Sequence, residues 1–227
     1  MVELTKSTLY KGVEAMLKHF TVAISRQKGS GGAFIGQEVA KHLGFKYMDR
    51  EILCQAASML HEDESILSER EERISNLWDK ILQAFSVCTP ETGYAPPPLR
   101  HINDEEIFET EAMVINKVAT NCSSVIVGRG AFHILRNNPR VLTVFLHASQ
   151  EFRANRIMNI YNIADIETAL ALLIQSDKQR RKFVQEHTGV EWTDACNYTL
   201  CINTEIIGFP EAAEIIMQTA KKMSQVQ

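Results

Sequence analysis

The feature that most constrains this chain is a glycine-rich loop between a buried strand and a helix. Residues 22–24 (VAI) form a short apolar run, and the loop that follows contains Gly29, Ser30, Gly31 and Gly32. Apolar residues then recur at helical spacing up to Gly44. Free backbone N–H groups at the start of a helix, together with the helix dipole, favour a bound anion. Phosphate is therefore the first ligand to consider.

The loop departs from the Walker A motif, G-x-x-x-x-G-K-[ST], at both of its reactive side chains. With Gly31 taken as the second glycine, Arg26 stands at the first. Gly32 then replaces the lysine that contacts the β- and γ-phosphates, and Ala33 replaces the hydroxyl residue that binds Mg²⁺. The loop backbone can still hold a phosphate, with Arg26 and Lys28 supplying positive charge. On this segment alone, a tight turn without a ligand is an equal alternative.

Composition indicates an ordinary globular protein. The chain is 45% hydrophobic and 23% charged. Its 227 residues are many for one domain and few for two, which favours one domain with an inserted subdomain. The net charge of −4 gives no general attraction to nucleic acid or to an anionic membrane, so neither partner is expected. No window has the apolar length of a membrane span, and charged residues interrupt the apolar runs that a signal peptide needs. We expect a cytoplasmic protein.

Cysteine and histidine usage indicates no metal centre. The five cysteines are odd in number and contain no C-x-x-C pair. His133 and His147 have no partner at ligand spacing. We therefore expect reduced thiols, histidines that pack or lie at polar edges, and no metal-ligating side chains.

Strand and helix signals alternate along the chain. Short apolar strands are predicted at 22–24, 45–48, 124–127, 141–146 and 198–202. Helices are predicted at 4–18, 33–43, 50–60, 63–85, 104–121, 149–160 and 165–187 and from Pro210 onward, with turn formers at 87–103. Strands of nearly continuous apolar character, separated by helices, predict an α/β fold with a five-stranded parallel sheet covered on both faces.

Charged side chains gather where these strands end, which is where ligands of parallel sheets bind. They are Arg26, Lys28, Asp49, Arg50, Arg129 and His147, with Arg153 and Arg156 on the helix after the fourth strand. A basic run follows on the next helix, at Lys178, Arg180, Arg181 and Lys182. Any one of these could be a solvated surface side chain. The whole set, in an acidic protein, indicates a polyanionic ligand.

Three segments carry a resemblance to a known family: ISRQKGSGGAFIGQEVAKHLGFKYMDREIL, VIVGRGAFHIL and SDKQRRKFVQEHTGVEWTDACNYTLCINT. In their order and spacing over residues 20–222 they resemble the cytidylate kinase-like family, a branch of the P-loop nucleoside monophosphate kinases. The resemblance implies a single domain, residues 1–227, with a three-layer P-loop NTPase core (20–61 and 109–222). It also implies a helical monophosphate-binding insertion at 62–108 and a short lid at 176–190. The implied reaction transfers a phosphoryl group from ATP to CMP or a related nucleotide, with Mg²⁺.

The resemblance also assigns roles to residues. The phosphate-binding loop is Gly29, Ser30, Gly31 and Gly32. The catalytic set is Arg26, Lys28, Lys178 and Arg180, the last two on the lid, whose arginines bridge donor and acceptor phosphates in the family. The resemblance places Asp49, Arg129 and Asp177 in the acceptor-binding set, and Arg50, Arg153 and Arg156 join that set because of their predicted places at the sheet edge. Phosphoryl transfer calls for such cations, because its transition state spreads negative charge over the transferred oxygens.

The chain departs from the family pattern at four positions. Family members commonly carry G-S-G-G-R-E, where this chain has Ala33 and Phe34. The aspartate of their G-R-D segment is Gly130 here. No Walker B aspartate follows the third strand, where Gly128 stands. These departures concern turnover more than fold.

Two other functions are open. One is a non-catalytic module that binds a nucleotide or phosphate. The other is a dinucleotide-binding Rossmann domain, because Gly29-x-Gly31 is followed by Asp49, 18 residues beyond Gly31. Phe34 at the third glycine position weakens that match. Residues 1–18 lie outside the resemblance and are a candidate contact for a homodimer.

Overall fold

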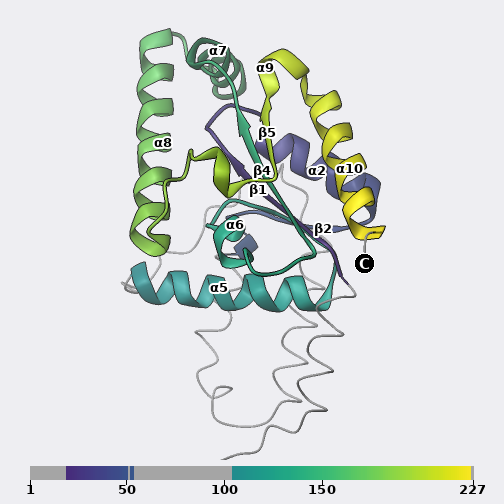
Figure 1. The fold of residues 1–227 in the computed structure, drawn as a ribbon. Coiled ribbons are helices and arrows are strands. Elements are labelled where there is room, and N and C mark those ends of the chain that lie inside the picture. Colours follow the sequence, from purple (N-terminus) through teal and green to yellow (C-terminus); the bar gives the residue numbers. More distant parts are fainter. Residues whose placement is uncertain (1–18, 51, 54–103, 226–227) are drawn as a thin grey trace, which may run out of the picture.

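The computed structural model describes residues 19–50, 52–53 and 104–225 (Figure 1). A five-stranded parallel sheet forms its centre, with the strand order β2-β3-β1-β4-β5. The strands are β1 (Thr21–Arg26), β2 (Lys46–Met48), β3 (Ser124–Val127), β4 (Val141–His147) and β5 (Leu200–Asn203). The predicted α/β class and parallel sheet are confirmed.

The helices are α2 (Gly32–Leu43), α5 (Asp104–Asn121), α6 (Ala131–Ile134), α7 (Gln150–Tyr161), α8 (Ile166–Thr188), α9 (Thr204–Ile207) and α10 (Phe209–Gln225). The predicted helices that fall on described residues are present, with ends shifted by about one residue. The short helices α6 and α9 were not predicted, because four residues are too few to display a helical period. The helices predicted at 4–18 and 63–85, most of the helix predicted at 50–60, the turns at 87–103 and most of the predicted insertion at 62–108 lie outside the described residues.

Helices cover both faces of the sheet. Val22 and Ile24 of β1 pack with Ile35 of α2 and Ile216 of α10 on one face. Ala23, between them, packs with Ile115 of α5 on the other face. Neighbouring residues of a strand point to opposite faces, so a strand buried on both sides is apolar at every position. This is why the strands read as continuous apolar runs.

The strand order excludes a Rossmann domain. In that fold the first strand lies beside the second, in the order 3-2-1-4-5-6. Here β1 lies between β3 and β4, and β2 forms the edge of the sheet. The dinucleotide-binding alternative is therefore wrong, although its two glycines and its acidic residue are present.

Helix α8 runs along one side of the sheet, from α7 toward α5 (Figure 1). It packs against α7 through a small apolar cluster of Ala154, Ile157, Ala169 and Leu173. Residues 176–188 of the predicted lid form the second half of this helix. Within the described ranges, no single helix is long and apolar enough to cross a membrane. Helices α7 and α8 together, bent by 106°, meet that test on length and composition alone.

Candidate active site at the carboxyl edge of the sheet

The glycine loop leaves β1 at Arg26 and enters α2 through Gly31. Gly29 and Gly31 both have left-handed backbones, with φ of +84° and +83°. A Cβ atom on Gly31 would lie 2.7 Å from the ring of Phe209, and one on Gly29 would lie 2.9 Å from the carbonyl oxygen of Arg153. Conformation and packing therefore both require glycine at these two positions.

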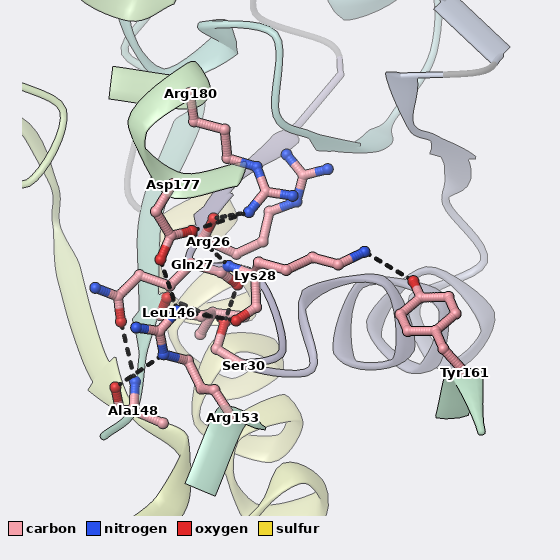
Figure 2. Close-up of polar contacts among 10 residues, drawn as sticks. All are labelled: Arg26, Gln27, Lys28, Ser30, Leu146, Ala148, Arg153, Tyr161, Asp177 and Arg180. Carbon is pink, nitrogen blue, oxygen red and sulfur yellow. Dashed lines mark hydrogen bonds and ion pairs between the residues drawn. The ribbon is translucent and has the colours of Figure 1, made fainter. Parts of the chain in front are cut away.

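Hydroxyl groups tie the loop to the ends of neighbouring strands. The Ser30 Oγ donates to the carbonyl oxygens of Gln27 (2.9 Å) and Leu146 (3.2 Å) (Figure 2). The Thr204 Oγ1 donates to the carbonyl oxygen of Ser30 at 3.0 Å. In the described structure, the backbone amides of Gly29, Gly31 and Gly32 donate to no protein group. The loop is thus held in shape while amides at the helix start remain available to an anion.

A carboxylate on α8 ties the loop to α7 and α8. Asp177 Oδ1 accepts the amide N–H of Lys28 at 2.8 Å, and Oδ2 accepts a hydrogen bond from Arg153 Nη1 at 2.6 Å (Figure 2). Arg153, with 4% of its side chain exposed, also donates to the carbonyl oxygens of Lys28 (3.0 Å) and Ala148 (3.2 Å). Arg153 and Asp177, both predicted to bind the acceptor, are thus paired with each other and with the loop.

Two hollows open at this edge of the sheet. The Arg129 hollow, of about 350 Å³, is lined by Ser25, Arg26, Arg50, Gly128, Arg129, Gly130, Ser176, Gln179, Arg180, Phe183, Val184 and Trp192. The loop hollow, of about 290 Å³, is lined by Arg26, Gln27, Lys28, Gly29, Gly31, Gly32, Ala33, Phe34, Arg156, Ile157, Ile160, Tyr161 and Arg180. Arg26 and Arg180 line both hollows. A ligand group between them would touch the two compartments at once.

The charge of both hollows is positive. None of the described residues that line them is an aspartate or a glutamate. Burial and, next in size, the neighbouring charge of Arg180 together lower the pKa of Arg26 to about 10. Burial also lowers the pKa of Arg180, an effect that Asp177 opposes and Arg50 reinforces. Three guanidinium groups therefore repel one another here, and a bound anion would relieve that repulsion.

Arg129 is held rigidly in the wall of its hollow. Its φ of +54° is left-handed, as are those of Gly128 and Gly130 on either side. The Arg129 Nε donates to the Oε2 of Glu111 at 2.6 Å, and Nη2 pairs with the same oxygen. Its guanidinium lies 4.4 Å from the ring centre of Phe183. A positive φ at a non-glycine residue is strained, and such strain gathers at functional sites.

Three further predicted cations, Arg50, Arg156 and Lys178, lie at different places around the two hollows. Arg50 lines the Arg129 hollow. Arg156, predicted to bind the acceptor, lines the loop hollow instead, with its guanidinium 4.8 Å from the ring centre of Phe209. Lys178 is exposed on α8 and is not among the residues that line either hollow. Of these three cations, Arg50 therefore lies at one hollow, Arg156 at the other and Lys178 at neither.

Lys28 and Asp49 both make hydrogen bonds to other protein groups. The Lys28 Nζ donates to the Tyr161 hydroxyl at 2.7 Å, at the side of the loop hollow (Figure 2). Asp49 Oδ1 accepts the amide N–H of Ile52 at 3.3 Å. This is the contact of a helix N-cap, as the sequence predicts for Asp49.

Sequence reasoning missed two important residues. Glu111 is fully buried on α5, yet it lies at helical spacing from the apolar positions 115 and 118. A carboxylate on an apolar stripe is a signal for a buried cationic partner, which here is Arg129. The second missed residue is Trp192. It is 4% exposed, packs edge-on against Phe145 and also lines the Arg129 hollow.

The residues around the loop do not form a magnesium site. Mg²⁺ takes oxygen ligands, commonly carboxylates, and Ala33 and Gly128 offer neither a hydroxyl nor a carboxylate. The guanidinium of Arg26, itself a cation, lies against Gly128. No group of three or more His, Cys, Asp or Glu side chains that could hold a metal occurs among the described residues. Mg²⁺ would reach this site only as part of a nucleotide complex.

Comparison with known sequences identifies a family. The sequence model of the cytidylate kinase-like family matches residues 21–206. A 122-residue stretch, 52% of this chain, is 30% identical to the S-adenosylmethionine-dependent nucleotide dehydratase of Lacinutrix mariniflava (strain JCM 13824 / KCCM 42306 / AKS432). The match covers 25% of that protein, so the chain spans about a quarter of the length of this relative.

Comparison with solved structures supports the fold alone. An uncharacterized protein from Eubacterium ventriosum ATCC 27560 superposes with a TM-score of 0.66 at 21% identity, over 89% of this chain and 99% of the other. The likeness to shikimate kinase from Acinetobacter baumannii in complex with shikimate is weaker. Its TM-score is 0.45 at 15% identity, over 94% of this chain and 99% of the other.

Proposed function

We propose that the chain, which belongs to the cytidylate kinase-like family, transfers the terminal phosphoryl group of ATP to CMP or a related nucleoside monophosphate. The observation that carries this proposal is that the loop hollow and the Arg129 hollow share Arg26 and Arg180. A donor in one hollow and an acceptor in the other would meet at these two guanidinium groups. Phosphoryl transfer depends mainly on such positioning and on cationic stabilisation.

The loop hollow suits the donor nucleotide. Its inner end presents the loop amides and Arg26, which match a polyphosphate. Its other lining residues include Phe34, with 46% exposure, and the exposed residues Ile160 and Tyr161. Apolar and aromatic side chains beside a cationic end are the combination that a nucleotide, with a flat base and charged phosphates, requires.

The Arg129 hollow suits the acceptor. Arg50 and Arg129 supply charge for a monophosphate, and the contact with Glu111 fixes the Arg129 guanidinium before any ligand arrives. Trp192 and Phe183 form an aromatic wall in the same hollow. CMP is the first acceptor to test because of the family.

The reaction needs no proton removal from a monophosphate that is already ionised. An oxygen of the acceptor phosphate forms a bond to the terminal phosphorus of ATP. The bond from that phosphorus to the bridging oxygen breaks, and ADP leaves with the electron pair. Negative charge grows on the oxygens around the transferred phosphorus, and Arg26 and Arg180 are placed to meet it.

A non-catalytic nucleotide-binding module is the second candidate. The absence of a lysine at Gly32 and of a hydroxyl at Ala33 favours it. The relative from Lacinutrix mariniflava is named a nucleotide dehydratase. That name is consistent with nucleotide binding in this chain. The dehydratase activity is not carried over, because the match covers only 25% of that protein.

A transfer assay separates the two candidates. Purified protein is given ATP and Mg²⁺ with CMP, UMP, AMP or GMP, and ADP and the new diphosphate are quantified. We expect transfer to at least one acceptor, and we expect Arg180→Ala to lower kcat by about 10³-fold. Arg181→Ala is the matched control, because Arg181 is exposed and pairs with Glu191. Nucleotide binding with no transfer to any of the four acceptors would leave the module as the function.

A further inference from the structure

We propose that Arg26 is a built-in counter-ion for the donor triphosphate, so that this chain binds the triphosphate without a divalent cation. The inference rests on the proposed function of this site. It concerns which group neutralises the phosphates. In a Walker A loop, that work is shared by the lysine and by the Mg²⁺ that the loop hydroxyl holds.

Arg26 occupies the space that side chains at two other positions would need. A Cβ atom on Gly32 would lie 2.5 Å from the Arg26 Cγ and 2.8 Å from its Cβ. A Cβ atom on Gly128 would overlap the Arg26 Nη1. Gly32 stands at the Walker A lysine, and Gly128 at the position after β3 where a metal-binding aspartate is missing. The arginine passes between the two glycines.

The contact at Gly32 is the more informative of the two. The Gly32 backbone is helical and is not among the residues with positive φ. Nothing in its conformation demands glycine, unlike Gly128, whose φ is +91°. The Arg26 side chain is therefore what excludes a side chain at position 32. Loss of the lysine and presence of the arginine are one structural change.

The Arg26 guanidinium has no hydrogen-bond acceptor within the described structure. Its neighbours in the site are paired: Arg129 with Glu111, and Arg180 with Asp177. Burial and Arg180 disfavour the charge of Arg26, whereas the nearby Tyr47 and Asp49 favour it in part, and the balance still lowers its pKa. Arg26 is half-buried, and its guanidinium presents five N–H donors that can bind an anion. Phosphate oxygens at the junction of the two hollows would supply them.

The same charges disfavour a divalent ion at this junction. Arg26, Arg50 and Arg180 all line the Arg129 hollow, and no described aspartate or glutamate lines either hollow. Mg²⁺ on the β- and γ-phosphates would compete with Arg26 for the same oxygens and would be repelled by the arginines. Free ATP should therefore bind at least as tightly as its magnesium complex.

Calorimetric titration of the full chain with ATP and with inorganic tripolyphosphate tests this. Each titration is done in EDTA and again in excess Mg²⁺. In EDTA, we expect wild-type affinity equal to or higher than that in Mg²⁺. Arg26→Met should weaken binding in EDTA by about 100-fold, the size expected for a lost charge-assisted contact. Arg181→Met, which removes an exposed charge paired with Glu191, should change affinity by less than about 2-fold.

Gly32→Ala provides a second variant that keeps the charge. Alanine is favoured over glycine at a helical position, and a urea unfolding curve measured beside the titration checks that the variant folds despite the new contact with the Arg26 Cβ and Cγ. The alanine methyl group would displace Arg26, and binding in EDTA should fall by about 10-fold or more. Wild-type binding that requires Mg²⁺, or unchanged affinity in both variants, would overturn the inference. ATP binding in EDTA without transfer to any acceptor would instead leave it standing and remove the proposed catalysis.

Discussion

Arg129, in the turn after β3, and Glu111, on α5, form a buried ion pair in which Nε donates to Oε2 at 2.6 Å. Glu111 has no exposed surface, whereas 13% of the Arg129 side chain is exposed. The carboxylate therefore holds one edge of the guanidinium and leaves the remainder facing the hollow that Arg129 lines. Binding and stability are coupled at this pair, so a single substitution cannot separate them.

Arg129→Ala should destabilise the fold by about 3 kcal/mol or more, because it leaves the Glu111 charge buried without its guanidinium. The double variant Arg129→Met, Glu111→Gln should recover most of this loss. It should still bind CMP about 100-fold more weakly than the wild type. Urea unfolding and calorimetric CMP titration measure the two effects. A double variant as unstable as Arg129→Ala, or one that binds CMP normally, would contradict this account.

Asp177→Asn should also destabilise the fold by about 3 kcal/mol, because Arg153 is buried and loses its charged partner. The reference is Glu186→Gln, whose carboxylate makes an exposed pair with Lys182 at 3.6 Å. That change should cost less than about 0.5 kcal/mol. Thermal unfolding of both variants gives the comparison. Equal shifts in Tm would show that the Asp177 contacts contribute no more than surface charge does.

Arg26→Met should raise the Tm of the ligand-free protein at neutral pH, with a gain of about 1 kcal/mol. The folded-state pKa of Arg26, about 10, lies below the ordinary value of 12.5. The unfolded chain therefore binds more protons between these values, and wild-type stability should rise with pH there. The destabilisation by the buried Arg26 charge is fully present below pH 10 and decreases as the pH rises above 10. Unfolding curves at neutral pH and just above the Arg26 pKa test this. A Tm gain of the variant that did not shrink at the higher pH would refute the assignment.

Tyr161→Phe should tighten ATP binding by about 3-fold, because it removes the hydroxyl that accepts a hydrogen bond from Lys28 at 2.7 Å. The variant keeps the aromatic ring, whose centre lies 4.7 Å from the Lys28 Nζ. Lys28 would then be freer to turn toward the phosphates. CMP affinity serves as the internal control and should not change. Weaker ATP binding would indicate that Tyr161 itself contacts the donor.

The sequence predicted the sheet and its loop because both leave periodic or local signals. Buried strands are apolar at each residue, and the loop glycines occupy turns that side chains would strain. Arg50 and Arg129 were placed at a strand edge by the same reasoning, and both line the Arg129 hollow. In a parallel sheet the carboxyl ends of all strands lie at one edge, so a residue that directly follows a predicted strand is placed at that edge by the sequence alone.

The direction of helical side chains is what the sequence could not provide. Arg153 and Arg156 lie one turn apart on α7, yet Arg153 is buried against Asp177 while Arg156 lines the loop hollow. Which of the two is buried depends on how α7 docks on α8 and on the loop. Gly32 and Gly128 read as losses of function in the sequence. Only the structure shows that the Arg26 side chain lies against both glycines, and that it is what excludes a side chain at Gly32.

The loop formed by residues 29–32 depends on residues that are synthesised about 170 positions later. Phe209, the first residue of α10, covers Gly31, and the Thr204 hydroxyl holds the carbonyl oxygen of Ser30. On the ribosome the loop therefore emerges long before its supports do. A nascent chain that has not reached residue 209 has the phosphate-binding sequence without the packing of Phe209, so we expect it to bind nucleotide only weakly. Ligand binding should instead report that synthesis has passed the last strand.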